Sequence, residues 1–112
     1  MREAYRIIRA ETPTRDDFLT SRELGNALRN PSRRREWSEA ISVYDDVGYA
    51  VEQARYFGFK LGRYILRLSI PDGEPVELVQ TGPDPRHLSM FALLDQLVAW
   101  ADDSDIADAR DW

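Results

Sequence analysis

Cysteine is missing from the 112-residue chain, and histidine occurs once, at His87. The lack of cysteine excludes a disulfide framework, a thiol nucleophile and a cysteine-ligated zinc site, and a single histidine excludes a histidine-rich metal centre. No apolar run approaches the ~18 to 20 residues of a membrane-spanning helix. The N-terminus has no charged-then-apolar signal pattern. We therefore expect a cytoplasmic protein that holds no metal and has no membrane partner.

Lysine is also scarce: the chain has one lysine, Lys60, and fourteen arginines. This excess of arginine reflects either a GC-rich coding bias or bidentate recognition of carboxylates and phosphates. The formal net charge of -5 comes mainly from residues 101–112, which contain five aspartates and one arginine. The first 100 residues are close to neutral and lack the basic face that is typical of nucleic-acid binding. We therefore expect no nucleic-acid partner.

Apolar and β-branched residues recur with the period of two that is typical of strands. The pattern predicts about five strands, at residues 3–10, 40–44, 63–70, 76–79 and 87–91. The helical stretches are segregated from most of these strands, which argues against a repeated βαβ arrangement. We therefore predict a single compact α+β domain over residues 1–100, with mostly antiparallel strands and short helices packed on the sheet. Residues 101–112 are expected to form an acidic C-terminal tail.

Two helices are predicted from apolar stripes at helical spacing. Asp45 and Asp46 supply an N-cap for the first helix. Its core-facing positions are Val47, Ala50, Val51, Ala54 and Phe57. The buried positions of the second helix are Leu93, Leu94, Leu97, Val98 and Trp100. Near the N-terminus, Thr14 followed by Asp17 predicts a short capped helix.

Several charged features have both a structural and a functional interpretation. The run 33–35 of three arginines is either a solvated loop or a contact for a phosphate or an acidic partner. The segment 101–112 is either a solvated terminus or a segment that docks on an arginine-rich surface of this chain, a second copy or a partner. Arg6 shares a strand face with Ile8, so this face is not a purely solvated one. His87 is either an ordinary half-exposed residue or a catalytic one.

Four segments, taken in order, resemble a set of small bacterial proteins: YRIIRAETPTRDDFLTSRELG, WSEAISVYDDVGYAVEQAR, LGRYILRLSIPDGEPVELVQTG and RHLSMFALLDQLVAW. The layout of those proteins is in turn similar to the ADP-ribosyltransferase-like fold, a compact split sheet that binds NAD between its halves. The resemblance covers about residues 4–100. It implies NAD as cofactor and three site positions: Arg or His on the first strand, Ser, Thr or Tyr before the long helix, and Glu or another polar residue on a late strand.

The resemblance places Arg6 or Arg9 at the first position, Ser42 or Tyr44 at the second, and His87 or Ser89 at the third. It implies catalytic roles for Arg6, Tyr44 and His87. It implies NAD binding by Arg6, Arg9, Ser42 and Tyr44. In these roles Arg6 holds the pyrophosphate and Tyr44 stacks on the nicotinamide ring. The late segment reads His-Leu-Ser-Met-Phe and lacks the family's glutamate, so this chain uses another residue, binds NAD without turnover, or keeps only the fold.

The alternative is a non-catalytic protein-protein interaction module. Such a module contacts a protein partner, or a second copy in a homo-oligomer, through Arg29–Trp37 and the acidic segment. The two hypotheses differ in one structural feature. Convergence of Arg6, Tyr44 and His87 on one pocket favours binding of NAD or another phosphorylated small molecule. Pairing of Arg6 with a buried carboxylate, with no cleft beside it, favours the interaction module.

Overall fold

The computed structural model describes residues 2–112, with the backbone alone for residues 103–105. Its strands and α-helices are β1 (Arg2–Ile8), α1 (Arg34–Glu39), β2 (Ile41–Tyr44), α2 (Val47–Tyr56), β3 (Tyr64–Ile70), β4 (Glu77–Gln80), β5 (His87–Phe91), α3 (Leu94–Trp100) and β6 (Ala101–Asp108). Two short 3-10 helices, η1 (Arg15–Phe18) and η2 (Pro31–Arg33), lie between β1 and α1. The predicted α+β class is confirmed, and β6 extends the sheet beyond the five strands expected.

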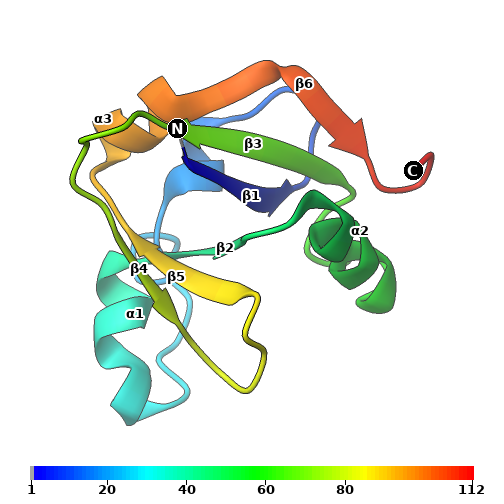
Figure 1. The fold of residues 1–112 in the computed structure, drawn as a ribbon. Helices are drawn as coiled ribbons and strands as arrows, with labels where there is room; N and C mark the ends of the chain where they lie inside the picture. The colour runs from blue at the N-terminus through cyan, green and yellow to red at the C-terminus, as the bar shows by residue number, and fades with distance from the viewer. Residues whose placement is uncertain (1) are drawn as a thin grey trace.

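All strands belong to one open antiparallel sheet with the order β4-β5-β2-β1-β3-β6. β1 pairs with β3 along its whole length, from Arg2 opposite Ile70 to Ile8 opposite Tyr64. In contrast, the register between β1 and β2 is a single pair, Tyr5 opposite Tyr44. Figure 1 shows the two halves, β6-β3-β1 and β2-β5-β4, diverging from this junction. Within the described chain, strand pairing between the two halves is therefore limited to this one pair.

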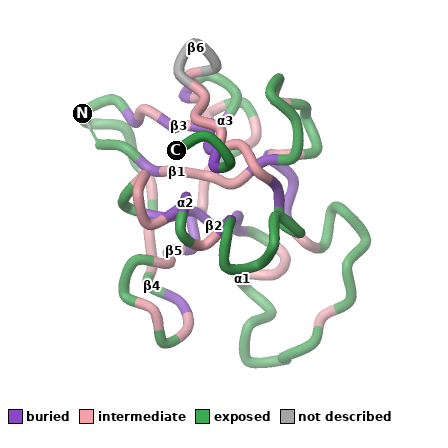
Figure 2. Tube along the Cα trace, turned by 90° about the vertical axis from the view of Figure 1, so that its right-hand side faces the viewer, coloured by how far each residue is buried: buried purple, intermediate pink, exposed green. Residues whose placement is uncertain are grey.

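Alternation along the strands gives the sheet two buried faces. One face packs against α3 and η1 and has a core built on β1, β2 and β3, including Ile8, Val43 and Leu66. The other face is covered by α2, whose Val51 packs with Ile65 of β3. Figure 2 shows buried positions on the strands and exposed ones in the connections. Each fully buried aliphatic side chain of this size contributes roughly 1.5 to 3 kcal/mol of transfer free energy.

The helix stripes are largely as predicted, with exceptions at the helix ends. Ala50, Val51 and Ala54 of α2 are buried, but Phe57 lies just past the helix and is 43% exposed. In α3, Leu97 and Trp100 are buried. Leu93 and Val98, expected to be buried, are exposed. The seven-residue α3 has one covered side, and Val98 lies about 100° around the helix from Leu97.

The C-terminal segment departs from the predicted division at residue 100. Ala101–Asp108 forms β6, which pairs with the edge of β3. Arg67 contacts Asp102 at 2.7 Å, and Arg63 contacts Asp108 at 2.5 Å. Ala109 beyond the strand is completely buried. The segment thus continues the sheet, with Arg67 of β3 offsetting Asp102 and Arg63, just before β3, offsetting Asp108.

Candidate functional site

Two adjoining cavities of about 990 and 500 Å³ lie where β1 and β2 separate. We call them the larger and smaller lobes of the junction cleft. The region common to both lobes, here termed the waist, is lined by Arg6, Ile7, Arg33, Ser42, Leu61, Thr81 and His87. These residues come from six separate stretches of sequence. The cleft has the size of a small-molecule site.

Arg6 of β1 is held at the waist by two backbone carbonyl groups. Its Nε donates to the carbonyl oxygen of Asp17 at 2.6 Å, and its Nη1 donates to that of Ser42 at 2.7 Å. Burial lowers the pKa of Arg6, while the charge of Asp17 opposes this shift. The guanidinium nevertheless stays charged, because its ordinary pKa is above 12. Within residues 2–112 we find no ion pair between Arg6 and a carboxylate.

The strand register explains why this arginine opens a cleft. Antiparallel continuation from the pair of Tyr5 and Tyr44 would bring Ser42 opposite Ile7, where strand pairing satisfies backbone groups. The described pairing stops before that point, and Arg6 supplies the donor to the Ser42 carbonyl instead. A side chain therefore replaces strand pairing at the junction and separates the two halves of the sheet.

Tyr44 and His87 lie opposite each other on the paired strands β2 and β5. Their ring centroids are 5.5 Å apart in an edge-to-face arrangement. Burial, with the charge of Asp84, raises the pKa of the Tyr44 hydroxyl, and the charge of Arg6 opposes this shift. Tyr44 is therefore a protonated hydroxyl at neutral pH, and it lines the smaller lobe.

His87 is oriented by its neighbours on the β4–β5 hairpin. Its Nδ1 lies 3.1 Å from the carbonyl oxygen of Thr81 and 3.0 Å from Thr81 Oγ1. A carbonyl oxygen only accepts hydrogen bonds, so Nδ1 carries the proton of the neutral ring. Thr81 Oγ1 is in turn 3.0 Å from Ser89 Oγ. Nε2 is left with its lone pair on a side chain that lines both lobes, and it can accept a proton or a hydrogen bond there.

The structure brings the predicted site residues to one place. Arg6, Ser42 and His87 line both lobes, and Tyr44 lines the smaller lobe. Arg9 and Ser89 line the larger lobe alone. Ser42 contributes its backbone carbonyl to Arg6 rather than a hydroxyl contact. Arg6 is not paired with a buried carboxylate, so the arrangement matches the first of the two geometries considered above.

The arginine run 33–35 divides into three environments. Arg35 contacts Glu77 at 2.7 Å and lies 4.1 Å from the ring centre of Phe91. Arg34 is exposed and lines neither lobe. Arg33 lines both lobes. The sequence alone does not separate the three, because their neighbours come from distant strands and loops.

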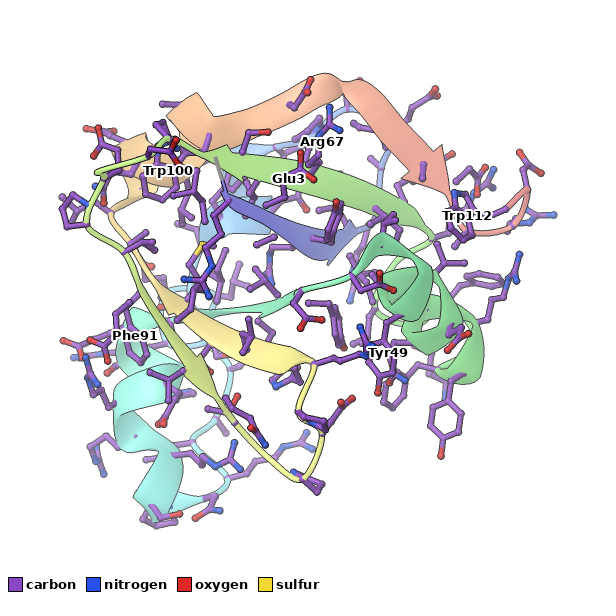
Figure 3. All side chains as sticks on the ribbon, viewed as in Figure 1. Glu3, Tyr49, Arg67, Phe91, Trp100 and Trp112 are labelled. Carbon is purple, nitrogen blue, oxygen red and sulfur yellow. The ribbon has the colours of Figure 1, made fainter. Side chains whose placement is uncertain are left out.

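Asp84 lines the smaller lobe and is held by Tyr49, which lies outside the lining. Tyr49 belongs to α2, and its hydroxyl donates a hydrogen bond to Asp84 on the β4–β5 hairpin (Figure 3). This bond raises the pKa of Tyr49 to about 12 and lowers the pKa of Asp84 below its ordinary value. Asp84 also accepts from the backbone N–H of Arg86 at 2.9 Å. Sequence reasoning missed this pair, whose partners are 35 residues apart.

Other observations limit the class of site. No cluster of three or more histidine, cysteine, aspartate or glutamate side chains positioned to hold a metal occurs in the described part of the chain. Across the same residues, no helix is long and apolar enough to cross a membrane. Comparison of the chain with protein-family models, curated proteins and solved structures finds no match in any of the three.

Proposed function

We propose that this chain binds a phosphorylated small molecule in the junction cleft. NAD is the ligand that the resemblance to ADP-ribosyltransferase-like proteins implies. The observation that carries the proposal is the half-buried guanidinium of Arg6, which lines the cleft and donates hydrogen bonds to two backbone carbonyl groups rather than to a carboxylate. A ligand phosphate gives this guanidinium a directly hydrogen-bonded anionic partner, which the nearby charge of Asp17 does not.

The chemistry of Arg6 suits a phosphate. The two hydrogen bonds to backbone use Nε and Nη1 and fix the plane of the guanidinium. No hydrogen bond to a described residue uses Nη2, which is left to donate to a ligand. Charge-assisted hydrogen bonds from arginine to phosphate are about twice as strong as neutral ones. Prior fixation of the donor also reduces the entropy lost on binding.

The other predicted residues have roles that fit this ligand. The aromatic ring of Tyr44 in the smaller lobe packs against a flat ring such as nicotinamide. His87 presents Nε2 to the same space, where it accepts a hydrogen bond or a proton from a ligand hydroxyl. Binding comes first in this proposal. Release of nicotinamide from NAD is the assay that then separates a transferase from a binding protein.

A thermal melt with and without millimolar NAD tests the proposal. A ligand at ~100 times its dissociation constant stabilises by roughly 2.7 kcal/mol, which raises the melting temperature of a domain this size by about 10 °C. We expect this rise in the wild type and its loss in Arg6→Ala, each compared with its own ligand-free melt. Arg2→Ala on the same strand is the control, because Arg2 is exposed and lies outside the cleft. An equal rise in Arg6→Ala would contradict the assignment.

A protein-interaction function is the second candidate, and one observation favours it. Tyr56, Phe57 and Phe59 form an aromatic segment at the end of α2 that is exposed by 79, 43 and 37%. Apolar side chains gathered on a surface are typical of interaction sites. Light scattering of the wild type and of Tyr56→Ser tests this function. A concentration-dependent oligomer that the substitution dissociates supports it, and a monomer at all concentrations removes self-association.

A further inference from the structure

We infer that Arg33 is a second ligand for the bound anion, and that this anion is a pyrophosphate group held at the waist of the junction cleft. The inference rests on the proposed function, because it names the charge class of the ligand for the same site. It concerns Arg33, which the arginine run by itself does not distinguish from its neighbours.

Arg33 is placed by the short helix that precedes α1. Pro31 begins this 3-10 helix, and the side chain of Asn30 caps it by accepting from the N–H of Ser32 at 3.1 Å. The helix ends at Arg33, whose side chain lines both lobes. Its Nη2 lies 3.8 Å from the position that a Cβ on Gly82 would occupy. The guanidinium therefore reaches across to the loop that follows β4.

Arg33 has no protein partner in the described part of the chain. It makes no ion pair or side-chain hydrogen bond there, although Arg35, two residues later, has both with Glu77. Arginine adjacent to carboxylates usually pairs with them. A cleft-lining arginine that remains available is a donor for a ligand.

The charges at the waist point to a highly charged anion. The residues common to both lobes include Arg6 and Arg33 and no aspartate or glutamate. In the smaller lobe the acidic side chain is Asp84, which already accepts from Tyr49 and from the backbone of Arg86. Two guanidinium groups match a pyrophosphate, with one phosphate for each, better than a singly charged carboxylate or diester.

The position of the waist agrees with this ligand class. A pyrophosphate that joins two larger groups has its charge in the middle and its uncharged parts on both sides. The larger lobe contains the Trp37 ring, and the smaller lobe contains the rings of Tyr44 and Phe57. Each lobe thus offers aromatic surface to a group attached to one of the two phosphates.

Calorimetric titration of the full chain with inorganic pyrophosphate, orthophosphate and NAD tests the inference. We expect Arg33→Ala to weaken pyrophosphate and NAD binding roughly tenfold to hundredfold, because a charge-assisted hydrogen bond is lost. Orthophosphate should bind the wild type more weakly than pyrophosphate does. Its affinity should also fall less in Arg33→Ala. Arg34→Ala is the matched control. It removes the same charge from the next residue in sequence, whose side chain lies outside the cleft.

The outcomes separate this inference from the proposed function. If NAD binds the wild type and Arg33→Ala with equal affinity, while Arg6→Ala loses binding, the role of Arg33 is wrong and the proposed function stands. An equal loss in Arg33→Ala and Arg34→Ala indicates a general charge effect and also overturns the inference. If the wild type binds neither NAD nor pyrophosphate, both are wrong. Ligand-free melts of the two variants check that each remains folded.

Discussion

The guanidinium of Arg6 donates a 2.7 Å hydrogen bond to the carbonyl oxygen of Ser42, at the point where β1 and β2 stop pairing. This contact has a structural and a functional consequence. It satisfies the Ser42 carbonyl oxygen, which does not pair with β1, and it fixes a positive charge at the waist of the cleft. The same residue therefore stabilises the junction and defines its chemistry.

Substitution of Arg6 by alanine should destabilise the protein as well as remove the anion site. The change deletes two charge-assisted hydrogen bonds, to the carbonyl groups of Asp17 and Ser42. We expect the free energy of unfolding to fall by about 2 to 4 kcal/mol, measured by urea denaturation. Arg2→Ala, at an exposed position on the same strand, should stay within about 0.5 kcal/mol of the wild type. Equal stability of all three proteins would contradict a structural role for Arg6.

Removal of residues 103–112 should destabilise the sheet. The deletion takes away most of β6, the buried Ala109 and the Asp108 partner of Arg63. We expect a loss of about 3 kcal/mol, because the edge of β3 becomes exposed to water, and urea denaturation measures it. Asp108→Asn, which keeps the strand and weakens one partly exposed ion pair, should cost at most about 1 kcal/mol. A deletion that unfolds at the wild-type urea concentration would show that β6 is dispensable.

Gly62→Ala should be one of the most damaging small substitutions in the chain. Gly62 precedes β3 with φ near +140°, and a Cβ there would lie 2.2 Å from the carbonyl oxygen of Ile8. We expect a loss above about 2 kcal/mol, because the backbone itself must move. Gly58→Ala is the matched control: it also has positive φ, but nothing lies within 4 Å of its Cβ, so about 1 kcal/mol is expected. Melting temperatures of the two variants compare the costs directly, and a smaller drop for Gly62→Ala would contradict the close approach.

Most of the fold could be predicted from the sequence, because its signals are local. The strand alternation of Ile41 and Val43 and the stripe of Ala50, Val51 and Ala54 depend on neighbours in the chain. β6 was missed because its aspartates are typical of a solvated terminus. The partners of Asp102 and Asp108 are Arg67 of β3 and Arg63 just before β3, which are 35 and 45 residues away in sequence. No local pattern reveals that pairing.

The residues that line the cleft were predictable from the sequence only in part. The resemblance implies the site role of Arg6, and strand alternation adds that its face, shared with the buried Ile8, is not purely solvated. Arg33 could not be chosen from its run, since Arg34 and Arg35 have the same residue type and similar exposure. The tertiary fold gives each a different environment. Long-range contacts thus determine which of several equivalent side chains faces the cleft.

Titration of the tyrosines tests the hydrogen bond between Tyr49 and Asp84, a residue that lines the smaller lobe. The hydrogen bond to Asp84 raises the pKa of Tyr49 to about 12, above its unfolded value of 10.0. The resulting stability is complete below pH 10 and is lost as the pH rises towards 12. Tyr49→Phe should remove one late-ionising phenol from the phenolate absorbance curve, while Tyr5, whose pKa is also about 12, remains. Loss of a phenol that ionises near pH 10, instead of near pH 12, would contradict the contact with Asp84.

His87 offers a direct view of the cleft, because it is the single histidine of the chain. Nitrogen NMR spectra of the neutral ring should show the proton on Nδ1, since the Thr81 carbonyl oxygen lies 3.1 Å away. Thr81→Val removes Oγ1 and keeps that carbonyl, so we expect the same tautomer in this control. Addition of NAD or pyrophosphate should shift the Nε2 resonance more than that of Nδ1, because Nε2 is the nitrogen left for a ligand. A ring protonated on Nε2 in the free protein would contradict this orientation, and Nε2 could then donate a hydrogen bond to the ligand but not accept one.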